Sequence, residues 1–150
     1  MTIDASSTYS CTVATSQGDF TMQLDAGQAP VTVNNFVHLA RTGFYEGLTF
    51  HRVERGFVVQ GGDPLGNGTG GPGYRLPDEV GDAPWTKGSL GMASNAAGVS
   101  GSQFFILLGD APHLASSGVY NHFGRVVAGA DVVESIRVGD KILGITVEVS

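Results

Sequence analysis

Three polar residues stand in largely apolar surroundings in this chain of 150 residues. Arg52 and Gln60 lie within short segments that are otherwise mostly apolar, and Gln103 directly precedes a run of five large hydrophobic residues. A guanidinium donates hydrogen bonds and an amide both donates and accepts them, but neither group is a nucleophile. Any one of the three alone is readily explained as a surface residue or a strand end. A site that contained all three would act through positioned hydrogen bonds and a fixed positive charge.

Sequence motifs for other kinds of chemistry are absent or incomplete. Ser100 and Ser102 lack the spacing of a nucleophile elbow, and the four histidines show no paired spacing for a metal. The GNGTGG segment matches a dinucleotide fingerprint in form only, because Pro72 and Pro77 follow where a helix should begin. The net charge of -6, without any basic run, argues against nucleic acid as a partner. We therefore predict no metal, no cofactor and no nucleic acid.

The elements that would position these residues are predicted to be mainly strands. Apolar and polar residues alternate from Phe20 to Leu24, which is the period of a half-buried strand. The turn residues just before this segment predict a hairpin of residues 9–16 with residues 20–24. Further strands are predicted at Leu48–Val53, Phe57–Gln60, Ser89–Ala93, Gln103–Leu108, His122–Val127 and Ile142–Val149. About eight short strands favour a closed barrel.

Two amphipathic helices are predicted beside the strands. Pro30 begins the first and Gly43 ends it, with apolar residues between them at the spacing of one helical face. The second is shorter and covers residues 130–137. Because each helix must bury its apolar face, both should pack on the barrel. The predicted fold is mainly β, a closed antiparallel barrel of about eight strands with two covering α-helices.

Residues 61–84 form a glycine- and proline-rich stretch with almost no apolar period. Irregular segments of this length inside a compact domain are usually functional. We therefore expect a long surface loop that borders a binding groove.

The remaining signals concern the chain as a whole. Cys11 lies in an alternating stretch, so we expect a small buried core residue and not a reactive thiol. The amino terminus has no signal-peptide pattern, and no stretch approaches the ~20 apolar residues of a membrane span. The expectation is a single domain over residues 1–150, in the cytoplasm and without membrane contact.

Two longer motifs carry a resemblance to a known family. FHRV-x-x-GFVVQGGD, from Phe50, and GSQFFI, from Gly101, resemble the two signature segments of the cyclophilins. The GNGTGG loop and the later FGRV segment are similar to that family too, and the resemblance runs from about Ser10 to the end of the chain. It implies a cyclophilin-like barrel and peptidyl-prolyl cis-trans isomerase activity, which assists protein folding.

The resemblance also implies roles for individual residues. Arg52 matches the catalytic arginine, and Gln60 is the second catalytic position. The implied substrate-binding residues are Phe57, Val58, Ala93, Ser94, Gln103, Phe105, His113, Leu114 and Tyr120.

Four of these residues depart from the best-known family pattern. Val58 replaces methionine, Ser94 replaces asparagine, His113 replaces tryptophan and Tyr120 replaces histidine. The spacing between the leucine at position 114 and Tyr120 is also longer by about two residues, so the last match is the loosest. Because His113 offers less aromatic surface than tryptophan, the resemblance implies weak binding of cyclosporin. The expected partners are proline-containing peptides and flexible protein segments, bound by a monomer.

The implied chemistry suits the residues. Rotation about a peptide bond costs ~18–20 kcal/mol because conjugation is lost at the twisted transition state. The prolyl nitrogen then regains a lone pair, and a guanidinium fixed beside it, as at Arg52, binds the twisted form better than the planar one. Two alternatives remain: a cyclophilin-fold module that binds proline segments without turnover, and a small-molecule-binding barrel unrelated to proline.

Overall fold

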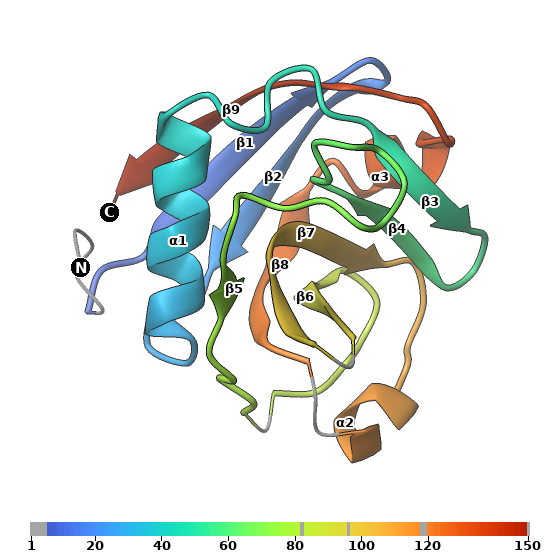
Figure 1. Ribbon diagram of the computed structural model, residues 1–150. Helices are drawn as coiled ribbons and strands as arrows, with labels where there is room; N and C mark the ends of the chain where they lie inside the picture. Colours follow the sequence, from blue (N-terminus) through green and yellow to red (C-terminus); the bar gives the residue numbers. More distant parts are fainter. Residues whose placement is uncertain (1–5, 82, 96, 118–119, 150) are drawn as a thin grey trace.

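The computed structural model describes residues 6–81, 83–95, 97–117 and 120–149 (Figure 1). Nine strands and three helices occur within these ranges. The strands are β1 (Tyr9–Thr15), β2 (Gly18–Leu24), β3 (Phe50–Glu54), β4 (Val58–Gly61), β5 (Arg75–Leu76), β6 (Ser89–Asn95), β7 (Gly98–Leu107), β8 (His122–Ala128) and β9 (Ile142–Val149). The helices are α1 (Pro30–Arg41), α2 (His113–Ser117) and α3 (Ala130–Ser135). No helix in these ranges is long and apolar enough to cross a membrane.

The strands form one antiparallel sheet that curls into a barrel (Figure 1). Their order is β3-β4-β7-β6-β8-β2-β1-β9, and the short β5 pairs with β7 outside this path. Backbone hydrogen bonds join the two ends of the sheet, from Phe50 N to Asp140 O at 2.9 Å and from Ile142 N to Leu48 O at 2.8 Å. The prediction of a mainly β, antiparallel barrel of about eight strands is confirmed.

Most predicted element bounds are close to the observed ones, but β7 begins at Gly98, five residues before the predicted start, and two elements were not predicted. The hairpin of β1 and β2 and the helices α1 and α3 are present, although α3 ends at Ser135, two residues earlier than predicted. Helix α2 was not among the two predicted helices, because its five residues are too short to show a helical period. Strand β5 was not predicted either, because its two residues lie inside the predicted loop 61–84 and depend on pairing with β7.

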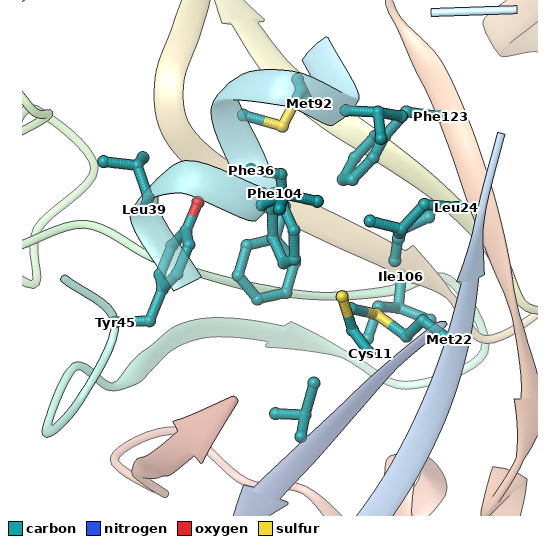
Figure 2. Close-up of a cluster of buried hydrophobic side chains, with 14 of the residues drawn as sticks. Cys11, Met22, Leu24, Phe36, Leu39, Tyr45, Met92, Phe104, Ile106 and Phe123 are labelled. Atoms are coloured by element: carbon teal, nitrogen blue, oxygen red, sulfur yellow. The ribbon is translucent and has the colours of Figure 1, made fainter. Parts of the chain in front are cut away.

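Helix α1 buries its apolar face over the inside of the barrel. Figure 2 shows Phe36 of this helix beside Phe104 of β7, and their ring centroids are 5.6 Å apart in an edge-to-face arrangement. Cys11 of β1 lies in the same core with no exposed surface, which confirms the predicted core residue. Burial raises the pKa of its thiol to about 12, despite the opposing effect of Arg41, so the reactive thiolate is strongly disfavoured.

The beginning of α1 is satisfied by a residue from the long loop. Its N-cap, Ala29, makes no side-chain hydrogen bond to the helix. The Glu79 carboxylate accepts from Val31 N at 2.9 Å and from Thr32 N at 2.6 Å, which satisfies two of the first unpaired amides. Glu79 N in turn donates to the buried side chain of Asn121, one residue before β8, at 2.7 Å. The loop, the helix and the segment that leads into β8 are thereby held together.

Candidate active site

A pocket of about 120 Å³ opens on the barrel surface where β3, β4, β6 and β7 meet. It is lined by Arg52, Phe57, Val58, Gln60, Ala93, Ser94, Phe105, Leu114 and Tyr120. All nine were predicted from the sequence as site residues. The other two predicted residues lie next to the pocket: Gln103 is hydrogen-bonded to Gln60, and the His113 ring is 5.8 Å from the Phe57 ring. The structure therefore brings the predicted residues together, while their roles in binding and catalysis stay predictions.

Arg52 faces the pocket because of an irregularity in β3. Phe50 pairs with Gly61 but Arg52 pairs with Gln60, so His51 is an extra residue in the strand. In a regular strand Phe50 and Arg52 would point to the same face. Phe50 is fully buried in the core, whereas Arg52 is exposed, because the bulge turns the following side chains to the other face.

A chain of hydrogen bonds orients the Arg52 guanidinium. Its Nη1 donates to Gln60 Oε1 at 3.3 Å, and Gln60 Nε2 donates to Gln103 Oε1 at 3.2 Å. Gln103 Nε2 then donates to the backbone carbonyl of Gly70 at 2.9 Å. Since each amide is held at both ends, the oxygen of Gln60 is directed at Arg52. The guanidinium carbon also lies 5.9 Å from the centre of the Phe57 ring, within range of a cation–π contact.

The last link of this chain depends on a loop organised around Asp63. Its Oδ1 accepts from Leu65 N at 2.8 Å, and its Oδ2 accepts from Asn67 N at 3.0 Å and also from Gly68 N. Burial alone would raise the pKa of this carboxyl, but the backbone donors outweigh burial and lower the pKa below its ordinary value. A Cβ on Gly70 would come within 2.1 Å of Asp63 Oδ1, so only glycine fits there.

The apolar side of the pocket is part of a second, smaller hydrophobic cluster. Phe105, which is 5% exposed, stacks on Trp85 with ring centroids 5.6 Å apart, and Tyr120 meets both rings edge-on. A Cβ on Gly91 would approach Phe105 Cζ to 2.4 Å and Trp85 Cη2 to 2.8 Å. A bare backbone at Gly91 is therefore what allows both rings to pack there.

Trp85 is the residue of this site that the sequence analysis missed. It lies just after the end of the long irregular segment, in a sequence context without periodicity. Trp85 is 6% exposed, its ring stacks on Phe105, and it does not line the pocket itself. The available signal was the presence of one tryptophan in the whole chain, next to a segment already assigned to the groove.

A second, more polar pocket of about 400 Å³ adjoins the first. The two share Gln60, Ala93 and Ser94, and the second continues along the glycine-rich residues 68–71 to Arg75. The loop 61–84 therefore borders a groove, as predicted.

No group of three or more histidine, cysteine, aspartate or glutamate side chains that could hold a metal ion occurs among the described residues. The chemistry available in the pocket is that of one guanidinium, the neighbouring amides and an apolar wall.

Comparison with known proteins identifies what this arrangement resembles. The family model described as cyclophilin-type peptidyl-prolyl cis-trans isomerase/CLD matches residues 10–147. A peptidyl-prolyl cis-trans isomerase of Synechococcus elongatus is 47% identical over 135 residues, which cover 89% of this chain and 92% of the relative. Peptidyl-prolyl cis-trans isomerase B of Bacillus subtilis is 48% identical over 122 residues, covering 80% and 84%.

Solved structures agree with these relatives. The crystal structure of a cyclophilin-type peptidyl-prolyl cis-trans isomerase of Cryptosporidium parvum superposes with a TM-score of 0.86 at 31% identity, covering 94% of this chain and 98% of that one. A second crystal structure of the Cryptosporidium protein was obtained in the presence of the dipeptide Ala-Pro, and its TM-score is 0.84.

Proposed function

The chain belongs to the family of cyclophilin-type peptidyl-prolyl cis-trans isomerases, and from that premise we propose that it turns over Xaa–Pro bonds in the pocket beside Arg52. The proline ring would enter between Phe57, Phe105 and the other apolar residues of the wall. Ala93 and Ser94, in the part of β6 that extends beyond its pairing with β8, would hold the substrate backbone. The observation that carries this proposal is that Arg52 is held at the mouth of an apolar pocket by an oriented glutamine.

Each polar residue has a distinct part in the proposed mechanism. Arg52 would donate toward the prolyl nitrogen when its lone pair reappears in the twisted amide. Gln60 would hold the guanidinium in place, and Gln103 would hold Gln60. No bond to the protein forms and no proton is transferred, so catalysis rests on stronger binding of the twisted form than of the planar one.

Arg52 supplies only part of the required rate enhancement. One hydrogen bond from a charged group is worth roughly 1.5–3 kcal/mol, or about one to two decades of rate. Shortening isomerisation from tens of seconds to milliseconds takes about four decades, or roughly 5–6 kcal/mol. The remainder would come from the apolar wall of Phe57, Phe105 and Leu114, which removes water from the dipolar planar amide and fixes the ring.

The direct test is the substitution Arg52→Ala. We expect a folded protein whose kcat/KM on a short Xaa–Pro peptide falls at least about 10-fold, the lower limit for one charged hydrogen bond. The measurement is exchange between cis and trans peptide signals by NMR.

Arg55→Ala is the matched control, because Arg55 is a nearby exposed arginine whose guanidinium donates to the carbonyl of Glu134 and does not line the pocket. Its kcat/KM should be close to that of the wild type. Near-normal turnover by a well-folded Arg52→Ala protein would refute the proposed mechanism. Peptide binding without any turnover by the wild type would instead favour a non-catalytic binding module.

Proposed partners are proline-containing peptides and flexible protein segments. The related Cryptosporidium structure obtained with Ala-Pro supports this choice. We further propose a monomeric, single-domain, cytoplasmic enzyme that assists protein folding. Its one cysteine is buried, which suits a reducing compartment. Sedimentation tests the monomeric state, and cell fractionation tests the cytoplasmic location.

A further inference from the structure

Glu54 forms an ion pair with Arg52 at the rim of the proline pocket. Its carboxylate contacts Nη2 of the guanidinium, while Nη1 of the same group donates to Gln60. The Arg52 and Glu54 side chains are 48% and 50% exposed, so both are accessible to a bound peptide. Glu54 does not line the pocket, and none of the proposed catalytic contacts uses it.

The position of Glu54 follows from the same bulge that turns Arg52 outward. After the extra residue His51, the strand alternates regularly, so Arg52 and Glu54 share the outer face of β3. Both side chains therefore stand on the side of the strand from which the pocket opens.

Glu54 also lies at the end of the groove that is farther from the glycine-rich pocket. Along β3, Arg52 pairs with Gln60 and Glu54 pairs with Val58. The glycine-rich pocket touches Gln60 but does not touch Val58. Glu54 is therefore displaced from Arg52 away from the glycine-rich pocket, and a peptide reaches it on only one side of the bound proline.

Arg52 is the one cation paired with the Glu54 carboxylate among the described residues, so an incoming basic side chain competes with Arg52 alone. Arg52 is the cation of the pocket wall and already forms the pair with Glu54. The nearby Arg55 donates to the carbonyl of Glu134 in α3, and so is directed away from the rim. Arg75 lines the glycine-rich pocket and does not line the pocket beside Arg52. An ion pair this exposed contributes little to folding stability, so stability alone does not account for a glutamate here.

We propose that Glu54 is a specificity-determining residue that favours substrates with a basic side chain on one side of the Xaa–Pro pair. The inference rests on the proposed isomerase function of the neighbouring pocket. Where the substrate peptide extends out of the pocket past Phe57 and Arg52, a lysine or arginine side chain of the peptide meets the Glu54 carboxylate. The carboxylate can turn from Arg52 to this new cation or be shared between the two. An acidic side chain at the same place is repelled. The attraction acts on peptide binding, so it changes KM more than kcat.

The experiment compares peptides that differ only in charge. Each contains one Xaa–Pro pair and carries either lysine or glutamine at one position before or after it. The measured quantity is the ratio of kcat/KM for the lysine peptide to kcat/KM for the glutamine peptide. At a low ionic strength of about 0.01 M, we expect a ratio of about 3 to 10 for the wild type on one side of proline and about 1 on the other. At about 1 M salt the ratio should approach 1.

Two variants of Glu54 separate charge from structure. The ratio should fall to about 1 in Glu54→Gln, and it should invert in Glu54→Lys, where lysine peptides become the poorer substrates. Glu148→Gln, which removes the same charge from an exposed position on β9, is the matched control and should keep the wild-type ratio. A ratio that stays the same in both Glu54 variants would overturn the proposal.

The glutamine peptides distinguish this failure from failure of the proposed function. They report on isomerisation itself, because they carry no charge for Glu54 to recognise. Turnover of glutamine peptides with an unchanged charge ratio would reject the role of Glu54 alone. Absence of any turnover, even of glutamine peptides by the wild type, would reject the isomerase function and the specificity that depends on it.

Discussion

At the scale of single residues, two adjacent phenylalanines on β7 serve different parts of the molecule. Phe104 is fully buried in the main core against Phe36, whereas Phe105 lines the pocket and stacks on Trp85 in the second cluster. Their opposite directions follow from the two-residue period of a strand. Phe105 therefore has both a packing role and a proposed substrate-binding role.

We expect Phe105→Ala to reduce both stability and activity. Loss of a buried phenylalanine costs about 3–5 kcal/mol, and the pocket loses its apolar wall at the same time. The measurements are denaturant unfolding and kcat/KM at a temperature where the variant is folded. Phe104→Ala is the matched control, since it should cost similar stability but leave kcat/KM of the folded protein much closer to the wild type. Equal losses of activity in the two variants would assign the Phe105 effect to folding alone.

His113 is expected to make the enzyme resistant to cyclosporin. It is an exposed residue at the start of α2, with its ring 5.8 Å from Phe57, where the family resemblance implies a tryptophan. The smaller ring should weaken the drug by roughly 1–3 kcal/mol, about one to two decades in affinity. Inhibition constants for the wild type and for His113→Trp test this, and the variant should be the more sensitive protein. Nanomolar inhibition of the wild type would contradict the prediction.

At the scale of elements, the loop 63–70 supports the residues proposed for catalysis. Asp63, which is 1% exposed, binds the loop backbone, and the Gly70 carbonyl at the other end of the loop holds Gln103. A long irregular segment can therefore place an oriented acceptor beside the site.

We expect Asp63→Ala to lower kcat/KM about 3- to 10-fold by releasing the chain of hydrogen bonds that ends at Arg52. The loss should be mainly in kcat, because the apolar wall that binds proline is unchanged. Asn67→Ala is the control within the same loop, since the Asn67 side chain binds only Thr69 among the described contacts. Wild-type kcat in a folded Asp63→Ala protein would show that the loop does not position Arg52.

At the scale of the whole molecule, two partly buried histidines are expected to make stability depend on pH. His122 packs against Trp85 with ring centroids 4.6 Å apart, and its Nδ1 is buried without a hydrogen-bond partner among the described residues. Desolvation lowers the pKa of His122 below its ordinary value, although the Pro84 carbonyl and Asp25 oppose this shift. Burial lowers the pKa of His51 as well.

The unfolded chain therefore binds these protons more readily than the folded one. The contribution of these neutral histidines to the free energy of unfolding should be fully present above the unfolded histidine pKa of about 6.5. It should be lost as the pH falls below that value. Free energies of unfolding measured between about pH 7.5 and pH 5 test this. In His122→Gln the decrease should be smaller, and a decrease equal to that of the wild type would exclude His122 as a cause.

The sequence by itself determined the family, most of the element bounds and the set of residues that meet at the pocket. Hydrophobic periodicity is a local property, so the hairpin of β1 and β2 and the helix α1 could be predicted from their own residues. The site residues were predicted because two long motifs, around Arg52 and around Gln103, resemble those of a known family. Spacing alone did not distinguish Arg52 from an ordinary surface arginine.

The tertiary structure decided what depends on contacts between distant segments. The bulge at His51 is visible only in the register of β3 with β4, yet it turns Arg52 and Glu54 to the outer face. Trp85 becomes part of the site only because the barrel brings it against Phe105, and Glu79 caps α1 from 47 residues along the chain. Such contacts join residues with no shared local pattern, so their energies depend on the folded chain and leave no periodic signal in the sequence.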